Sequence, residues 1–255
     1  MFKGVSVLPE RAESEHVPGA LLGQQWERVT DGAGLPQRVA EQLAEAIIQG
    51  ELSSGTRLSE PELATAFGIS RTPVREALYI LEKDELVERL PRRGARVAHL
   101  TAKQALDVYV CRAHLYGLSA RICAHILNEE QFEELRRIVS LMDEAVAVSD
   151  VGAYFRLNVD FHDFIGRSTG NDMLLRLMGG MGRVTLRFRY MSLMVPGRLE
   201  TSLAAHHQLL LDLQSGDADA AENRVRDIVC DAGDAVLAHF FDDTSEPVRE
   251  ILRKW

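Results

Sequence analysis

Two short helical patterns, separated by a tight turn and followed by a hairpin pattern, lie in the first half of the chain and allow very few folds. Apolar residues recur at helical spacing over residues 60–67 and again over 72–83, and Gly68-Ile69-Ser70 separates the two segments. The segments 86–90 and 95–100 flank the turn sequence PRRG, which predicts a β-hairpin. This order of elements indicates a helix-turn-helix followed by a wing.

A further helix precedes this pair. Apolar residues recur every four positions over 35–47, and Gly50 ends the pattern. The second helix of the pair has two candidate N-caps, because Thr72 is followed by Pro73, a favoured first helical residue, while Ser70 is equally suitable. Residues 35–102 are therefore expected to form one domain of three helices and a β-hairpin.

Arginines lie where this domain would meet DNA. Arg71 and Arg75 are one helical turn apart on the edge opposite the apolar stripe, and an arginine there can bond guanine O6 and N7 together. The hydroxyl groups of Ser70 and Thr72 suit neighbouring phosphates.

The tip of the predicted wing carries Arg92 and Arg93, and its strands carry Arg89 and Arg96, which suits contact with phosphates or the minor groove. The net charge of −9 excludes a uniformly basic coat but leaves room for this local surface.

From residue 101 onward the apolar period is helical almost throughout, which predicts an all-α bundle over residues 103–243. Residues 1–34 are expected to be a flexible arm and 244–255 a tail. No stretch is long and apolar enough to span a membrane, and the N-terminus has no secretory pattern. Three widely spaced cysteines fit reduced thiols, so we expect a cytoplasmic location.

Two histidines of the bundle are predicted to point inward. Asn158 and His162 are four residues apart on one helical pattern, and His206 lies on the apolar stripe of another. Two imidazoles and one amide oxygen could hold a divalent cation, although inward histidines are more often satisfied core residues. Both interpretations remain open from the residues alone.

The segment 35–101, and above all SRTPVREAL at 70–78, resembles the winged-helix domain of GntR-type bacterial transcription regulators. The all-helical remainder resembles the FCD-type effector domain of the FadR branch. The resemblance implies a homodimer that binds a palindromic operator in double-stranded DNA. It also implies that a small metabolite in the bundle makes the protein release the operator, as in a ligand-responsive repressor, or change its grip.

The resemblance also assigns roles to particular residues. It implies that Ser70, Arg71, Thr72 and Arg75 contact bases and phosphates, and that Arg93 and Gly94 form the wing tip in the minor groove. The following residues are the candidates for effector binding: Arg112, Asn158, His162, Arg187 and His206. Inward guanidinium groups would suit a carboxylate effector.

The chain departs from its relatives at the implied metal site. The resemblance suggests that Asn158, His162 and His206 ligate a divalent metal such as zinc or nickel, but the usual Asp is Asn158 and the last His is Ile228. With no protein charge to offset the ion, we expect any metal to be weakly held.

Two other functions compete with a regulator. A metal-dependent enzyme using His162 and His206 lacks any HExxH string, phosphate loop or nucleophile elbow, so we expect no enzymatic activity. An adaptor that uses the winged helix for protein contacts would favour exposed apolar groups where Arg71 and Arg75 lie.

Overall fold

The computed structural model describes residues 34–90, 94–243 and 246–254. The chain divides into two compact units. The first comprises Met1–Leu100 and Gly182–Arg187, and the second comprises Thr101–Met181 and Phe188–Trp255. The expected arm at 1–34 lies outside the described residues except for Gly34.

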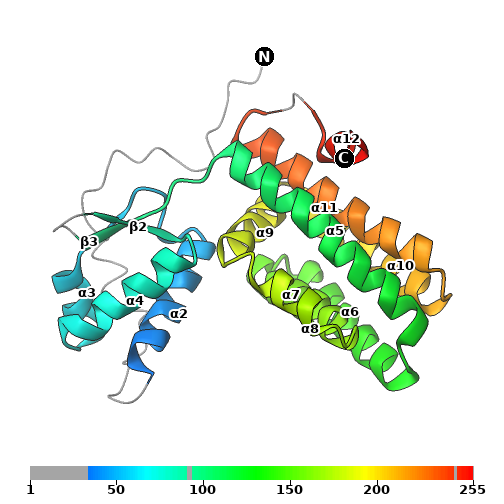
Figure 1. Ribbon diagram of the computed structural model, residues 1–255, viewed down its shortest axis with the longest axis horizontal. Helices are drawn as coiled ribbons and strands as arrows, with labels where there is room; N and C mark the ends of the chain where they lie inside the picture. The colour runs from blue at the N-terminus through cyan, green and yellow to red at the C-terminus, as the bar shows by residue number, and fades with distance from the viewer. Residues whose placement is uncertain (1–33, 91–93, 244–245, 255) are drawn as a thin grey trace. The chain divides into compact units, whose positions relative to one another are not determined.

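The first unit is a winged helix-turn-helix. Its elements in chain order are α2 (Leu35–Ile48), β1 (Arg57–Leu58), α3 (Glu60–Phe67), α4 (Arg71–Lys83), β2 (Val87–Leu90) and β3 (Gly94–Val97). Helix α4 packs against α2 and α3, and the antiparallel sheet has the order β1-β3-β2 (Figure 1). The apolar stripe of α4 is buried, as the sequence pattern predicts. The two-residue strand β1 was not predicted.

The turn between α3 and α4 depends on its backbone conformation. Gly68 ends α3 with φ +69°, a left-handed conformation that glycine adopts without strain. Ser70 is extended and precedes α4, which begins at Arg71. Of the two candidate caps, Ser70 is therefore the one at the helix boundary.

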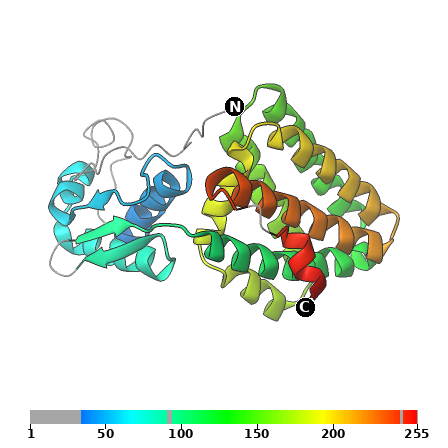
Figure 2. The same cartoon turned by 90° about the horizontal axis from the view of Figure 1, so that it is seen from above.

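The second unit is entirely helical among its described residues. Its helices are α5 (Ala102–Ile126), α6 (Glu129–Ala147), α7 (Val151–Ser168), α8 (Asp172–Gly179), α9 (Val184–Met194), α10 (Arg198–Gln214), α11 (Ala218–Phe240) and α12 (Val248–Lys254). Helix α9 is shared between the units, and its part from Phe188 onward belongs to the second. Helices α5 and α11 run side by side along most of their length (Figure 1), and α12 packs against both near the C terminus (Figure 2).

Small residues allow α5 and α11 to lie close together. Gly233 of α11 faces Tyr109 of α5 and Val248 of α12, and a Cβ at residue 233 would lie 2.8 Å from Tyr109 Cγ and 2.9 Å from Val248 Cγ2. Tyr109 is fully buried, and its hydroxyl donates to the carbonyl oxygen of Phe188 at 2.9 Å. Glycine is thus required by packing at this point of the bundle.

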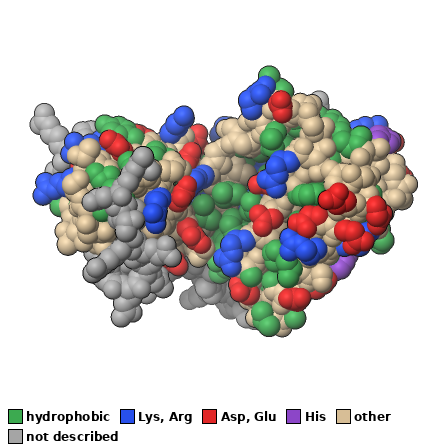
Figure 3. All heavy atoms as spheres, turned by 90° about the horizontal axis from the view of Figure 1, so that it is seen from below, with side chains coloured by type: hydrophobic (Ala, Val, Ile, Leu, Met, Phe, Trp, Pro, Cys, Tyr) green, Lys and Arg blue, Asp and Glu red, His purple; other side chains and the backbone are tan. Residues whose placement is uncertain are grey.

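Several large apolar residues of the bundle lie at the surface. Leu118 and Ile126 of α5 are exposed, because α5 buries mainly alanines and tyrosines against its neighbours. Leu177 of α8 is exposed as well. On the face shown in Figure 3, apolar side chains gather among charged ones. No described helix is long and apolar enough to cross a membrane.

Candidate functional site

The start of α4 presents the side chains that the sequence assigns to DNA. Ser70, Arg71, Thr72 and Arg75 are all exposed. Arg75 is held by Glu60 at the start of α3, because its Nε and Nη2 donate to the Glu60 carboxylate at 2.9–3.2 Å. The side chain of Arg75 remains 52% exposed, so its outer edge is open to a base.

The wing strands hold two arginines in different ways. Arg96 Nη2 donates to Glu88 at 2.6 Å, which offsets its charge, whereas the guanidinium of Arg89 lies over the Tyr79 ring with its carbon 3.7 Å from the centroid. Arg92 and Arg93, the predicted tip residues, lie outside the described residues.

Gly94 has a packing role that the sequence does not reveal. It begins β3 with φ +86°, and a Cβ there would lie 2.5 Å from the carbonyl oxygen of Leu58. Its glycine identity therefore allows β1 and β3 to approach each other.

A small cavity lies inside the second unit, and three of the five predicted effector residues line it. These are Arg112, Asn158 and His162. His206 is not a lining residue, but its Nε2 lies 3.1 Å from Nδ2 of the lining residue Asn158. The full lining is Arg112, Asn158, His162, Arg189, Ser192, Leu193, Arg198, Ser202, Ile228, Val229 and Ala232. None of these residues is acidic.

Arg112 is the least satisfied side chain of this cavity. It is only 3% exposed, and its Nε and Nη1 find no hydrogen-bond partner among the described residues. Its guanidinium carbon lies 5.4 Å from the Tyr109 ring centroid and 5.1 Å from that of Tyr116. These cation–π contacts stabilise the charge but are not hydrogen bonds to its N–H groups. A buried cation with unsatisfied donors indicates a site for an anion.

A chain of hydrogen bonds organises the polar wall of the cavity. Arg189 Nη2 donates to Asn158 Oδ1 at 2.7 Å and to the Asn158 carbonyl oxygen at 2.9 Å. Asn158 Nδ2 lies 3.1 Å from His206 Nε2, and His206 Nδ1 lies 2.7 Å from the carbonyl oxygen of Ser202. Since a carbonyl oxygen only accepts, His206 carries its proton on Nδ1 and accepts from Asn158 through Nε2.

Both histidines of the cavity are neutral near pH 7. Burial lowers the pKa of His206 to about 4, and the field of Arg189 acts in the same direction, while the bond to Ser202 opposes them. Burial, followed by the fields of Arg189, His206 and Arg112, holds the pKa of His162 well below its usual range. The positive charge of the site therefore lies on the arginines.

The predicted metal ligands come together, but they do not form a metal donor set. His162 Nε2 and His206 Nε2 are 3.4 Å apart, yet the oxygen of Asn158 is turned to Arg189 and only its NH₂ group faces the imidazoles. Ile228 lines the cavity and cannot ligate. Asp231, the nearest acid after it on α11, accepts a hydrogen bond from Arg249 at 3.1 Å and does not line the cavity. Among the described residues, no group of three or more His, Cys, Asp or Glu could hold a metal ion.

The structure does not bring Arg187 to the cavity, contrary to its predicted place in the effector site. Arg187 belongs to the first unit, where its Nη1 donates to the carbonyl oxygen of Ala98 at 2.8 Å and its Nη2 to Ser54 Oγ at 2.9 Å. Arg189 and Arg198 line the cavity instead, and so does Ser202. The sequence carried a signal for Ser202, because it precedes the inward His206 by one helical turn.

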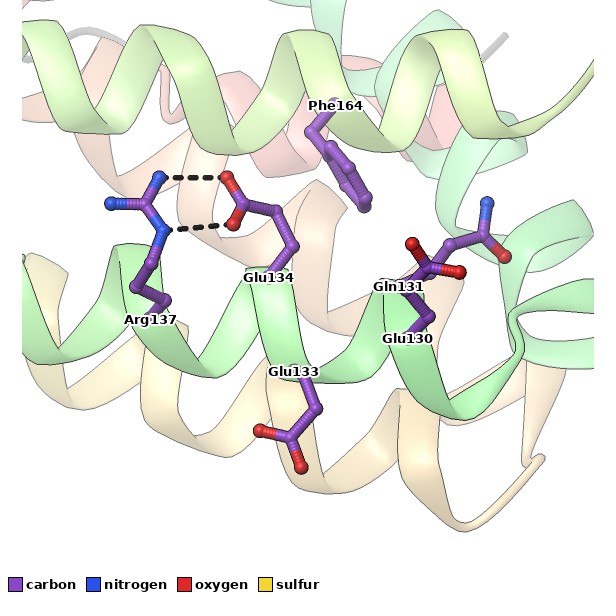
Figure 4. A pocket seen from close by; sticks show the side chains of 6 residues that line it. All are labelled: Glu130, Gln131, Glu133, Glu134, Arg137 and Phe164. Carbon is purple, nitrogen blue, oxygen red and sulfur yellow. Dashed lines mark hydrogen bonds and ion pairs between the residues drawn. The ribbon is translucent and has the colours of Figure 1, made fainter.

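A larger hollow on the bundle surface has none of these features. It lies between α6 and α7, and its lining residues are Glu130, Gln131, Glu133, Glu134, Arg137 and Phe164 (Figure 4). Arg137 already pairs with Glu134 through two hydrogen bonds of 2.7 and 2.8 Å. Its acidic side chains are solvated, so the hollow carries no comparable binding signal.

A winged helix-turn-helix joined in one chain to a helical unit with a buried cationic cavity defines a DNA-binding transcriptional regulator. The model for bacterial regulatory proteins of the gntR family matches residues 35–97, and the FCD domain model matches residues 107–230. The chain belongs to the GntR family and carries an FCD domain.

Its relatives are regulators, not enzymes. YdhC, an uncharacterized HTH-type transcriptional regulator of Bacillus subtilis, is 29% identical over 84% of this chain and 90% of its own. The "Probable D-xylose utilization operon transcriptional repressor" of Paenarthrobacter nicotinovorans is 30% identical over 72% of this chain and 83% of its own. The crystal structure of a "putative transcriptional regulator GntR from Rhodococcus sp. RHA1" is 26% identical, with a TM-score of 0.67 over 81% of this chain and 99% of that one.

Proposed function

We propose that this regulator binds operator DNA through the start of α4 and the wing, and that a small carboxylate in the cavity of the second unit controls that binding. The observation that carries the proposal is Arg112, a cation 3% exposed whose Nε and Nη1 lack partners among the described residues. Leaving such donors unsatisfied is costly, and an anion that enters the cavity would satisfy them.

The DNA-reading residues are inferred from their place on α4. Arg71 and Arg75 reach base edges, Ser70 and Thr72 bond phosphates, and Arg92, Arg93 and Gly94 belong to the wing that contacts the minor groove. Exposure of Ser70 and of the three residues in the first turns of α4 supports this assignment. A regulator that acts on the bacterial chromosome works in the cytoplasm, which is the location we infer.

We infer further that the regulator is a homodimer. Leu118 of α5 and Met173 and Leu177 of α8 are 41–57% exposed, and Ser119 Oγ donating to Met178 Sδ at 3.4 Å packs these two helices together. Exposed apolar residues on two helices that pack together suit a self-complementary interface. Two winged helices would then read the two halves of a palindrome.

The experiment that tests ligand control uses an operator selected from random duplexes. Fluorescence anisotropy measures operator affinity of the full chain with a panel of short carboxylates and their neutral amides. One acid is expected to change the affinity while its amide does not. Arg112→Met should bind the operator as before but lose the response, whereas exposed Arg167→Met should retain it. An unchanged response in Arg112→Met would refute the proposed site.

A further inference from the structure

The two imidazoles of the site could in principle ligate a metal ion. His162 Nε2 and His206 Nε2, 3.4 Å apart, are near enough to share one metal ion. Whether a metal ion binds there therefore depends on the side chains that surround the two imidazoles.

Arg189 holds the Asn158 amide in an orientation that does not suit a metal ion. Its Nη2 donates to Asn158 Oδ1 at 2.7 Å, and reversing the amide would place an NH₂ group against this donor. With Oδ1 facing Arg189, the amide presents only Nδ2 to the imidazoles. An amide nitrogen that donates protons cannot ligate a cation.

The lone pair of His206 is already engaged. Because Nδ1 donates to the carbonyl oxygen of Ser202, the Nε2 lone pair is the acceptor for Asn158 Nδ2, 3.1 Å away. His162 Nε2 approaches the same nitrogen. The imidazole pair is thus internally hydrogen-bonded and needs no ion to be satisfied.

The electrostatics of the cavity also oppose a divalent cation. Arg112, Arg189 and Arg198 line it without an acidic lining residue, and Asp163, the carboxylate whose field acts on Arg189, lies outside the lining. Arg189 is itself only 3% exposed. A metal would add positive charge to buried guanidinium groups, whereas an anion would offset them.

We propose that the cavity binds its carboxylate without a metal ion, with the Arg189 guanidinium as the cation where metal would otherwise lie. The proposal rests on the ligand control proposed above and assigns its chemistry. The cavity volume is only about 20 Å³, roughly the space of one water molecule, so the ligand class is a short acid, and the lining side chains must move apart to admit its carboxylate. Arg112 and Arg189 bond that carboxylate, and Ile228 contacts its carbon chain.

The first test uses the unmodified protein. Elemental analysis after purification without chelator or added metal should find zinc and nickel far below one atom per chain. Thermal melts with sodium formate, acetate, lactate and succinate, against sodium chloride, should give a rise in melting temperature that EDTA does not change. Stoichiometric metal that survives dialysis, or a rise that EDTA abolishes and zinc restores, would overturn the proposal.

A pair of variants tests the role of Arg189 directly. Ile228→His adds a third imidazole but leaves Arg189 and the turned amide in place, so zinc binding should stay weak. Removing the guanidinium as well, in Arg189→Met with Ile228→His, should produce stoichiometric zinc binding. Tight zinc binding by Ile228→His alone would show that Arg189 is no obstacle.

These outcomes separate the two proposals. If a carboxylate changes the melting temperature and operator affinity only with metal present, ligand control stands and metal independence fails. If no carboxylate changes operator affinity with or without metal, the proposed ligand control itself fails.

Discussion

Gly233→Ala tests whether close packing at α5 and α11 supports the cavity. The added Cβ would meet Tyr109 Cγ at 2.8 Å, Tyr109 Cδ2 at 3.0 Å and Val248 Cγ2 at 2.9 Å. Neither neighbour can move easily, because the Tyr109 hydroxyl is bonded to Phe188 and both residues are fully buried. The substitution must therefore shift packed elements.

The expected magnitude is a difference of two effects. Overpacking a rigid site costs about 2–3 kcal/mol, in the upper part of the usual range. Alanine in place of glycine in a helix contributes about 1 kcal/mol in the opposite direction. We therefore expect a net loss of about 1–2 kcal/mol in the free energy of unfolding.

Urea denaturation followed by circular dichroism measures this loss as a lower midpoint with unchanged slope. The matched control is Gly152→Ala in α7, where the nearest atoms are at an ordinary 3.5–3.6 Å, so stability should rise by up to about 1 kcal/mol. Because the Tyr109 ring supports Arg112, Gly233→Ala should also weaken the carboxylate response. A Gly233→Ala protein at least as stable as the unmodified one would refute the reasoning.

Other perturbations test the remaining sites. Arg75→Ala should weaken operator binding about 5- to 150-fold, with a smaller loss on unrelated DNA; gel shifts showing equal losses on both would remove its base-reading role. Arg112→Met removes an unsatisfied buried cation, so its ligand-free melting temperature should rise; a fall would mean the cation is satisfied. The pKa of His206 in the folded protein, about 4, lies below the unfolded value of 6.5. The shift contributes about 3 kcal/mol to the free energy of unfolding, complete above pH 6.5 and lost as the pH falls to about 4. The urea midpoint should therefore depend less on pH in His206→Gln than in the unmodified protein. An equally steep fall of the midpoint at acid pH in the variant would contradict the lowered pKa. Leu177→Glu should give a monomer by light scattering, and an unchanged dimer would exclude this interface.

The DNA-binding fold was predictable because its determinants are local. The stripe through Val74, Leu78 and Leu81 and the turn at Gly68 define α4 within one short stretch of the chain. Strand β1 was not predictable in this way, since its two residues are held by pairing with β3, which lies far along the chain.

The cavity was predictable in part for the same reason. His162 and His206 lie on clear apolar stripes, and the structure brings them together. Helix α9 has no such stripe, because its residues are buried on nearly all sides. Arg187 and Arg189 point about 200° apart on that helix, and nothing in the local pattern decides which faces the cavity.

Because the proposed cation of the cavity is the Arg189 side chain, the regulator's response depends on fewer conditions in the cell. A sensor that needs a bound metal responds to two concentrations at once, and its output falls when the cell is starved of that metal. Arg189 is present once in every molecule and stays in place when the medium changes. The gene under this regulator's control should therefore follow the supply of one metabolite alone, in metal-poor and metal-rich growth alike.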